Sequence, residues 1–196
     1  TTQRYPIITL ANKNSSENEE KTNKTFINFA RNARLSNLVF NIGEDYVVND
    51  SSNQESFYFG VVANYIENSV ISNVTLTNSA YAKTSSTFAK SISWESTRNV
   101  AKGVEKIPSN FVGAMLGYVY GGLISNISCS VPLKATASGD IKTYVGGIVG
   151  FANGTNLTNV DYAVNYVQKE NEKLNREKKH FESSKPYKIW SKYKKI

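Results

Sequence analysis

A four-residue phrase occurs four times in this chain and constrains its fold more than any other feature. The copies begin at Leu35, Ile71, Ile124 and Leu157 and read LSNL, ISNV, ISNI and LTNV. Their asparagines follow one another at spacings of 36, 53 and 33 residues. Such recurrence is typical of stacked-repeat proteins, in which each unit buries its apolar face against the next. We therefore expect the apolar residues of the phrases to lie inside: Leu35, Leu38, Ile71, Val74, Ile124, Ile127, Leu157 and Val160.

Three of the phrases also share an upstream stretch that contains glycines at matching positions. Residues 58–65 (YFGVVANY), 111–118 (FVGAMLGY) and 144–151 (YVGGIVGF) align without gaps, and each places a glycine eleven residues before its phrase. Glycine permits close backbone approach, or a positive φ, where a strand turns a corner. Each repeat is thus expected to contain two strand-like stretches separated by a turn. The repeat glycines are Gly60, Gly113, Gly117, Gly146, Gly147 and Gly150.

The asparagine of each phrase is a candidate for a structural ladder, with ligand binding as the alternative role. Stacking would bring Asn37, Asn73, Asn126 and Asn159 into one column, in which each amide bonds to the neighbouring unit, as stacked asparagines do in cross-β assemblies. Within residues 71–76, Ser72 and Asn73 also break the strict alternation of apolar and polar residues. This break predicts a bend between two short strands.

Two of the copies resemble a known family. Residues 111–128 (FVGAMLGYVYGGLISNIS) and 144–164 (YVGGIVGFANGTNLTNVDYAV) are similar to GLUG-type repeats. These repeats occur in bacterial cell-surface and secreted proteins, including adhesin-like proteins and the non-catalytic region of immunoglobulin A peptidases. The resemblance implies an all-β fold, namely a short right-handed parallel β-solenoid of about four coils. It also implies an extracellular or cell-surface location and a structural or adhesive role. The implied partners are a protein chain, other domains of the same longer chain, or a glycan.

Charge divides the chain into two parts near residue 164. The whole chain has a net charge of +7, and residues 165–196 contribute +6 of it through ten basic residues and four glutamates. We expect residues 1–164 to form the repeat domain, beginning with a short strand at residues 5–10. An insertion at about residues 79–109 would account for the 53-residue spacing and would form a short helix or an excursion loop.

The tail, residues 165–196, is predicted to be a basic helix or a linker. Good helix formers run without Gly or Pro up to Pro186, and Val167, Leu174 and Phe181 form a narrow apolar stripe. The end of the tail alternates cationic and aromatic residues, so its function could be that of a solvated linker, a protein-docking element, or a surface for nucleic acid or an anionic membrane. The residues proposed for such docking are Tyr187, Lys188, Ile189, Trp190, Lys192 and Tyr193.

No catalytic or metal-binding constellation is recognisable in the sequence, so we expect no active site and no cofactor. His180 is the only histidine and Cys129 the only cysteine, which excludes the usual zinc ligand sets within this chain. Asp140 and Asp161 lie in adjacent repeats, but neither has a repeat-related acidic partner of the kind that glycan hydrolysis requires. The alternative function is that of a repeat region in a larger secreted enzyme, a peptidase or a glycan-active enzyme, which positions a catalytic domain absent from this chain.

Overall fold

The computed structural model describes residues 5–10, 25–49, 55–78, 90–103 and 106–162. The chain divides into two compact units, Thr1–Ala163 and Val164–Ile196, and all described residues lie in the first. The predicted basic tail, with its helix and its candidate docking residues from Tyr187 to Tyr193, lies outside the described residues.

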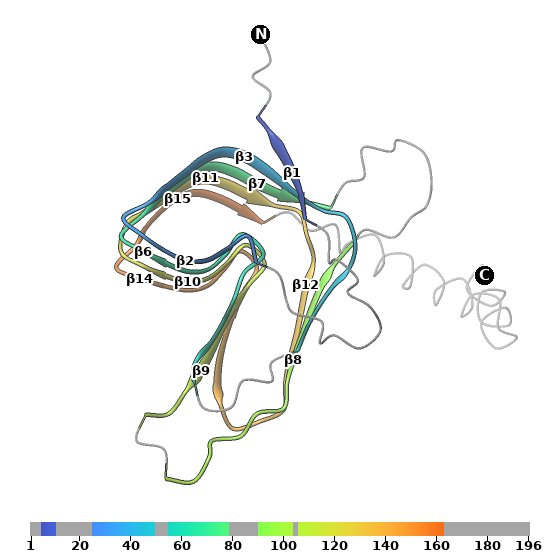
Figure 1. Ribbon diagram of the computed structural model, residues 1–196, viewed down its shortest axis with the longest axis vertical. Coiled ribbons are helices and arrows are strands. Elements are labelled where there is room, and N and C mark those ends of the chain that lie inside the picture. The colour runs from blue at the N-terminus through green and yellow to red at the C-terminus, as the bar shows by residue number, and fades with distance from the viewer. Residues whose placement is uncertain (1–4, 11–24, 50–54, 79–89, 104–105, 163–196) are drawn as a thin grey trace, which may run out of the picture. The chain divides into compact units, whose positions relative to one another are not determined.

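The described part is all-β, and its strands form four parallel sheets, which we name A to D (Figure 1). Sheet A contains β1 (Ile7–Leu10), β3 (Arg34–Ile42), β7 (Val70–Thr77), β11 (Leu123–Cys129) and β15 (Asn156–Tyr162). Sheet B contains β2 (Ile27–Arg31), β6 (Ala63–Glu67), β10 (Leu116–Tyr120) and β14 (Val149–Asn153). Sheet C contains β4 (Tyr46–Asn49), β8 (Ile92–Ser96) and β12 (Leu133–Ala137). Sheet D contains β5 (Phe57–Phe59), β9 (Ser109–Gly113) and β13 (Lys142–Gly146).

The chain visits these sheets in a fixed order. The second and third repeats, β5–β8 and β9–β12, each run through sheets D, B, A and C in turn. The first repeat, β2–β4, and the fourth repeat, β13–β15, each contain three of these four steps within the described residues. Every pairing between described strands is parallel, and successive repeats are neighbours in every sheet. The predicted all-β class is therefore confirmed, and the stacking of parallel strands in order is compatible with a β-solenoid.

The four phrases lie opposite one another in sheet A. Ile71 pairs with Leu35 on one side and with Ile124 on the other, and Leu157 pairs with Ile124. The apolar side chains of the two middle phrases are at most 1% exposed, as predicted, while those of the first phrase are half-buried. Leu157 and Val160 are 46% and 39% exposed, so the prediction that they lie inside was wrong. They belong to β15, and no described strand covers its outer edge.

The backbone at the asparagines explains the broken alternation in the phrases. All four have left-handed conformations, with φ between 51° and 61°. One such residue reverses the side on which the following residues face. Ile124 and Ile127, three positions apart, are therefore both buried. The sequence predicted a bend here, and β7 and β11 run through it as continuous strands.

The glycine-containing runs upstream of the phrases span two sheets each, whereas the sequence predicted one strand-like stretch. In the third repeat β9 ends at Gly113 in sheet D, and β10 begins at Leu116 in sheet B. Ala114 and Met115 form the corner between them and are fully buried. Sheets B and D consequently meet at an angle. The two sheet faces that enclose this angle point away from the core (Figure 1).

The predicted insertion at residues 79–109 contains one strand of the fold, which the sequence did not predict. Within its centre, residues 92–96 form β8, which pairs with β4 and β12 as the second repeat's strand of sheet C, whereas residues 97–103 form neither helix nor strand. Ile92, Trp94 and Ser96 alternate inward, and each is at most 2% exposed. Trp94 stacks on Phe57 of sheet D with ring centroids 6.3 Å apart, so this strand helps to fill the core. Residues 79–89 and 104–105 lie outside the described part of the chain.

Candidate binding surface

The predicted asparagine ladder lies on the outer face of sheet A. The side-chain amide of Asn73 donates to Oδ1 of Asn37 over 2.9 Å, Asn126 donates to Asn73 over 3.1 Å, and Asn159 donates to Asn126 over 2.8 Å. Each amide thus bonds to its counterpart in the preceding repeat. These bonds link the repeats to one another, which is a structural role.

The repeat glycines lie where backbones of different repeats or sheets approach closely. A Cβ at Gly113 would overlap the carbonyl oxygen of Leu116 and would lie 2.6 Å from the backbone nitrogen of Gly150. A Cβ at Gly147 would lie 2.6 Å from the ring of Tyr162, whose hydroxyl accepts a hydrogen bond from the Leu133 nitrogen. The remaining repeat glycines have comparably close neighbours: Gly60, Gly117, Gly146 and Gly150. These positions shape the corners and hold no ligand-binding group.

A surface that the sequence reasoning missed lies on the outer side of the angle between sheets B and D. It consists of seven aromatic side chains in two columns, which we call the aromatic seam. Alternation along each strand turns these rings outward: in β9, Asn110 and Val112 are fully buried, while Phe111 between them faces the opposite side. The sheet B column is Phe29, Tyr65, Tyr118 and Phe151, and the sheet D column is Tyr58, Phe111 and Tyr144.

Rings within each column stack on one another along the direction in which the repeats stack. In the sheet B column, successive ring centroids lie 5.5, 5.0 and 5.4 Å apart, with interplanar angles of 33°, 13° and 20°. In the sheet D column the corresponding distances are 5.3 and 5.2 Å, with angles of 10° and 4°. Each ring therefore covers much of the face of the next, and the columns present ring edges and tyrosine hydroxyls to their surroundings.

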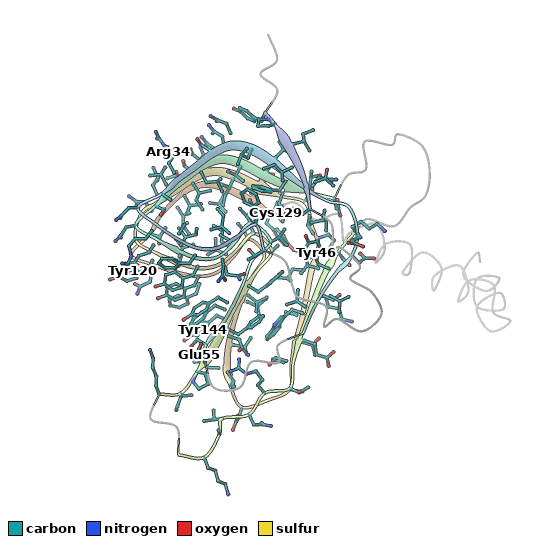
Figure 2. The ribbon with its side chains drawn as sticks, in the orientation of Figure 1. Arg34, Tyr46, Glu55, Tyr120, Cys129 and Tyr144 are labelled. Carbon is teal, nitrogen blue, oxygen red and sulfur yellow. The ribbon has the colours of Figure 1, made fainter. Side chains whose placement is uncertain are left out.

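The two columns contact each other edge to face. Phe111 and Tyr118 of the third repeat have centroids 4.9 Å apart at 82°, and Tyr144 and Phe151 of the fourth repeat are 4.9 Å apart at 66°. Aromatic pairs in such geometries contribute about 0.5–1.5 kcal/mol beyond the area that they bury. Figure 2 shows Tyr144 on the outer side of sheet D, among the rings that fill the angle toward sheet B. The rings therefore brace the angle between the sheets.

The seam nevertheless remains accessible. Phe29 is 53% exposed, the tyrosines of the seam are half-buried, and only Phe111 is close to fully covered. Tyr120, two residues beyond Tyr118 on the same face of β10, is 44% exposed and extends the aromatic surface. Ring edges from all four repeats, and hydroxyls from the second, third and fourth, thus meet solvent on one face of the molecule.

Most polar groups around the seam are neutral or already paired. Arg31 lies over the ring of Phe29, with Cζ 5.7 Å from the centroid, and forms an ion pair of 2.8 Å with Glu67. The ammonium of Lys142 lies 5.0 Å from the centroid of Tyr144. Burial, followed by the effects of Tyr118, Glu67 and Tyr58, raises the pKa of Tyr65 above its ordinary value of 10.0. The Tyr65 hydroxyl therefore stays protonated at neutral pH and can donate a hydrogen bond.

The other candidates for chemistry in the described part of the chain are its acidic residues and its thiol. No group of three His, Cys, Asp or Glu residues there could hold a metal ion. Cys129 is fully buried, and burial raises the pKa of its thiol to about 11, so it is protonated at neutral pH. Asp140 accepts a hydrogen bond of 2.6 Å from the backbone nitrogen of Val100. What the surface offers is contact area and hydrogen bonds.

A signal for the seam was present in the sequence. The aligned runs at residues 58–65, 111–118 and 144–151 each begin and end with an aromatic residue. These first and last residues form the seam pairs of the second, third and fourth repeats. The sequence predicts one strand for each run, and only the corner inside the run brings both of its ends to the same outer angle.

Comparisons with protein-family models, with curated protein sequences and with solved structures found no significant match. Among the described residues, no helix has the length and apolar character that a membrane span requires.

Proposed function

We propose that this chain is a non-catalytic structural and adhesive module that binds a glycan through the aromatic seam. In this proposal the body is a right-handed parallel β-solenoid of about four coils. It would be part of a GLUG-type bacterial protein that is secreted or displayed on the cell surface. The observation that carries the proposal is the seam itself, to which all four repeats contribute rings on one accessible outer face.

Two properties of the seam favour a glycan over a protein as the partner. First, its hydrogen-bonding groups are tyrosine hydroxyls, and of the two cations that the described residues place over its rings, Arg31 is already paired with Glu67. A surface of this kind suits an uncharged ligand rich in hydroxyl groups. Second, equivalent rings recur at nearly equal intervals, which suits a ligand that is itself built from repeating units.

A glycan array tests the proposal directly. The full chain should bind a subset of glycans and should release no product from the array. Removing two seam hydroxyls in the double variant Tyr65→Phe/Tyr118→Phe keeps both rings and their stacking. Each lost neutral hydrogen bond costs about 0.5–1.5 kcal/mol, so affinity should fall about fivefold or more. Tyr5→Phe, which removes a hydroxyl outside the seam, should bind like the original chain.

Three other outcomes would count against the proposal. Product release from the array would favour the enzyme alternative. Binding that the double variant leaves unchanged would place the ligand site elsewhere on the chain. Failure to bind any glycan, together with capture of a purified protein partner that the double variant no longer binds, would show that the seam is a protein-docking surface.

A further inference from the structure

The seam is periodic in one direction only. Along the stacking direction, each repeat places a ring at the same position as its neighbour: Tyr65 lies opposite Tyr118, and Tyr118 opposite Phe151, in the register of sheet B. Across the seam no such equivalence exists, because the two columns come from different sheets and their rings meet edge to face.

From this asymmetry we infer that the seam binds a linear, uncharged polysaccharide that lies along the stacking direction, with successive sugar units contacting successive repeats. The inference rests on the proposed function and specifies the class and the orientation of the ligand. A chain in this orientation finds a ring at the same position of the sheet B column in each of the four repeats. A chain lying across the seam would meet each kind of contact once.

The length of the seam sets how many units it can hold. Ring centroids in the sheet B column are separated by 5.0–5.5 Å, close to the spacing of about 4.8 Å between paired strands. Three such intervals separate the first repeat from the fourth, which gives a contact length of about 15 Å. If one unit corresponds to one repeat, about three to four sugar units fill the seam.

Repeated contacts of this kind make affinity depend on chain length. Each added unit that reaches a further repeat binds within a complex that is already formed, so its entropic cost is lower. Affinity should therefore increase several-fold per unit until the ligand spans the four repeats. Beyond that length the gain per unit should become small.

The experiment measures the affinity of the full chain by calorimetry for cello-, chito- and malto-oligosaccharides, each from one unit to about eight. The expected result is that at least one series shows a steep increase followed by a plateau near three to four units. Equal affinity for the single sugar and the longest oligomer would overturn the inference and leave glycan binding itself intact. Absence of binding to these series and to a glycan array would overturn both the inference and the proposed function.

A matched pair of variants ties the plateau to the seam. Phe29→Ala removes the exposed ring at the first-repeat end of the sheet B column, whereas Phe26→Ala removes a ring of similar exposure that contacts Phe40 and is outside the seam. Phe29→Ala should weaken only the longer oligomers and shift the plateau to a shorter chain, and Phe26→Ala should leave the whole profile unchanged. A uniform loss of affinity at every length in Phe29→Ala would contradict lengthwise binding. A merely structural effect of the substitution cannot produce a loss that depends on ligand length.

Discussion

Asn126 donates its side-chain amide to Oδ1 of Asn73 over 3.1 Å, and both residues have left-handed backbones with φ of 52° and 55°. One residue type therefore meets two requirements at once. It tolerates the conformation that lets both flanking apolar residues face the core, and its amide links adjacent repeats. This coincidence explains why the asparagine recurs in all four phrases.

Asn126 allows these two requirements to be separated. Asn126→Gly removes the ladder bonds but tolerates the left-handed conformation, whereas Asn126→Ala loses the bonds and strains the backbone. We expect Asn126→Ala to lower the free energy of unfolding by about 1 kcal/mol more than Asn126→Gly does. Urea titration of both variants measures the difference. Equal losses would mean that the conformation contributes nothing to the choice of asparagine.

Gly113 tests how tightly the corner between sheets D and B is packed. In Gly113→Ala the new methyl group would overlap backbone atoms of Leu116 and Gly150, which cannot move independently of their strands. We expect a loss of about 3 kcal/mol or more in the free energy of unfolding, above the usual range for overpacking by a small group. The matched control is Gly43→Ala, where the nearest atoms lie 3.6 and 3.7 Å from the new Cβ. The control should change stability little, and a similar loss in both variants would contradict the tight packing of this corner.

Trp94 tests the assignment of β8 to the core. Trp94→Ala should lower the free energy of unfolding by about 3–5 kcal/mol, because it leaves a large cavity beside Phe57. Val47→Ala on neighbouring β4, where Val47 is 51% exposed, should cost far less. Thermal or urea unfolding of both variants can be followed by circular dichroism, which does not depend on the substituted tryptophan. A small effect of Trp94→Ala would indicate that β8 lies on the surface and does not contribute to the core.

Stability should decrease at alkaline pH because two buried groups hold their protons more tightly in the folded chain. Burial raises the pKa of the Cys129 thiol from 9.0 to about 11, and burial together with Glu44 raises that of Tyr46 from 10.0 to about 12. Between about pH 9 and pH 12 the unfolded chain binds fewer protons than the folded chain, so the free energy of unfolding falls as pH rises. Below pH 9 these two groups contribute no pH dependence.

Two variants assign this alkaline loss to its groups. Cys129→Ala should remove the part of the decrease that begins near pH 9, although it is less stable overall because a buried side chain is shortened. Tyr46→Phe should keep that part and remove the part between about pH 10 and pH 12. Urea titrations at several pH values give the slopes. Identical slopes in the original chain and both variants would place the pH dependence in other groups.

Sheet A could be predicted from the sequence because its phrases are nearly identical. Sheet C could not, because its residues differ between repeats. Paired residues such as Tyr46, Ile92 and Leu133 share only an inward apolar side chain, and alternation of that kind is not specific to any one strand. The sequence predicts an excursion around Trp94 for this reason, since nothing in its local sequence resembles its partners Val48 and Ala135.

The seam was missed for a different physical reason. Whether an aromatic side chain faces the core or the surroundings depends on where its strand begins and turns. Tyr58 and Tyr65 belong to one sequence run but to two sheets, since the corner at Gly60 lies between them. Sequence identified the glycine as a turning point, but only the three-dimensional angle between the sheets shows that both rings face the same outer side.

The asparagine ladder has a direction, since every amide donates to the preceding repeat and every side-chain oxygen accepts from the following one. A repeat between two others therefore donates a ladder hydrogen bond to the repeat before it and accepts one from the repeat after it. Duplicating residues 109–141 between existing repeats would preserve this order at both new junctions and lengthen the molecule by one strand spacing of about 4.8 Å. A repeat inserted in the opposite sense would bring like groups together at both junctions. The number of repeats could thus set the distance between groups attached to the two ends of the protein. That distance can be increased one repeat at a time, but the direction of a single repeat cannot be inverted.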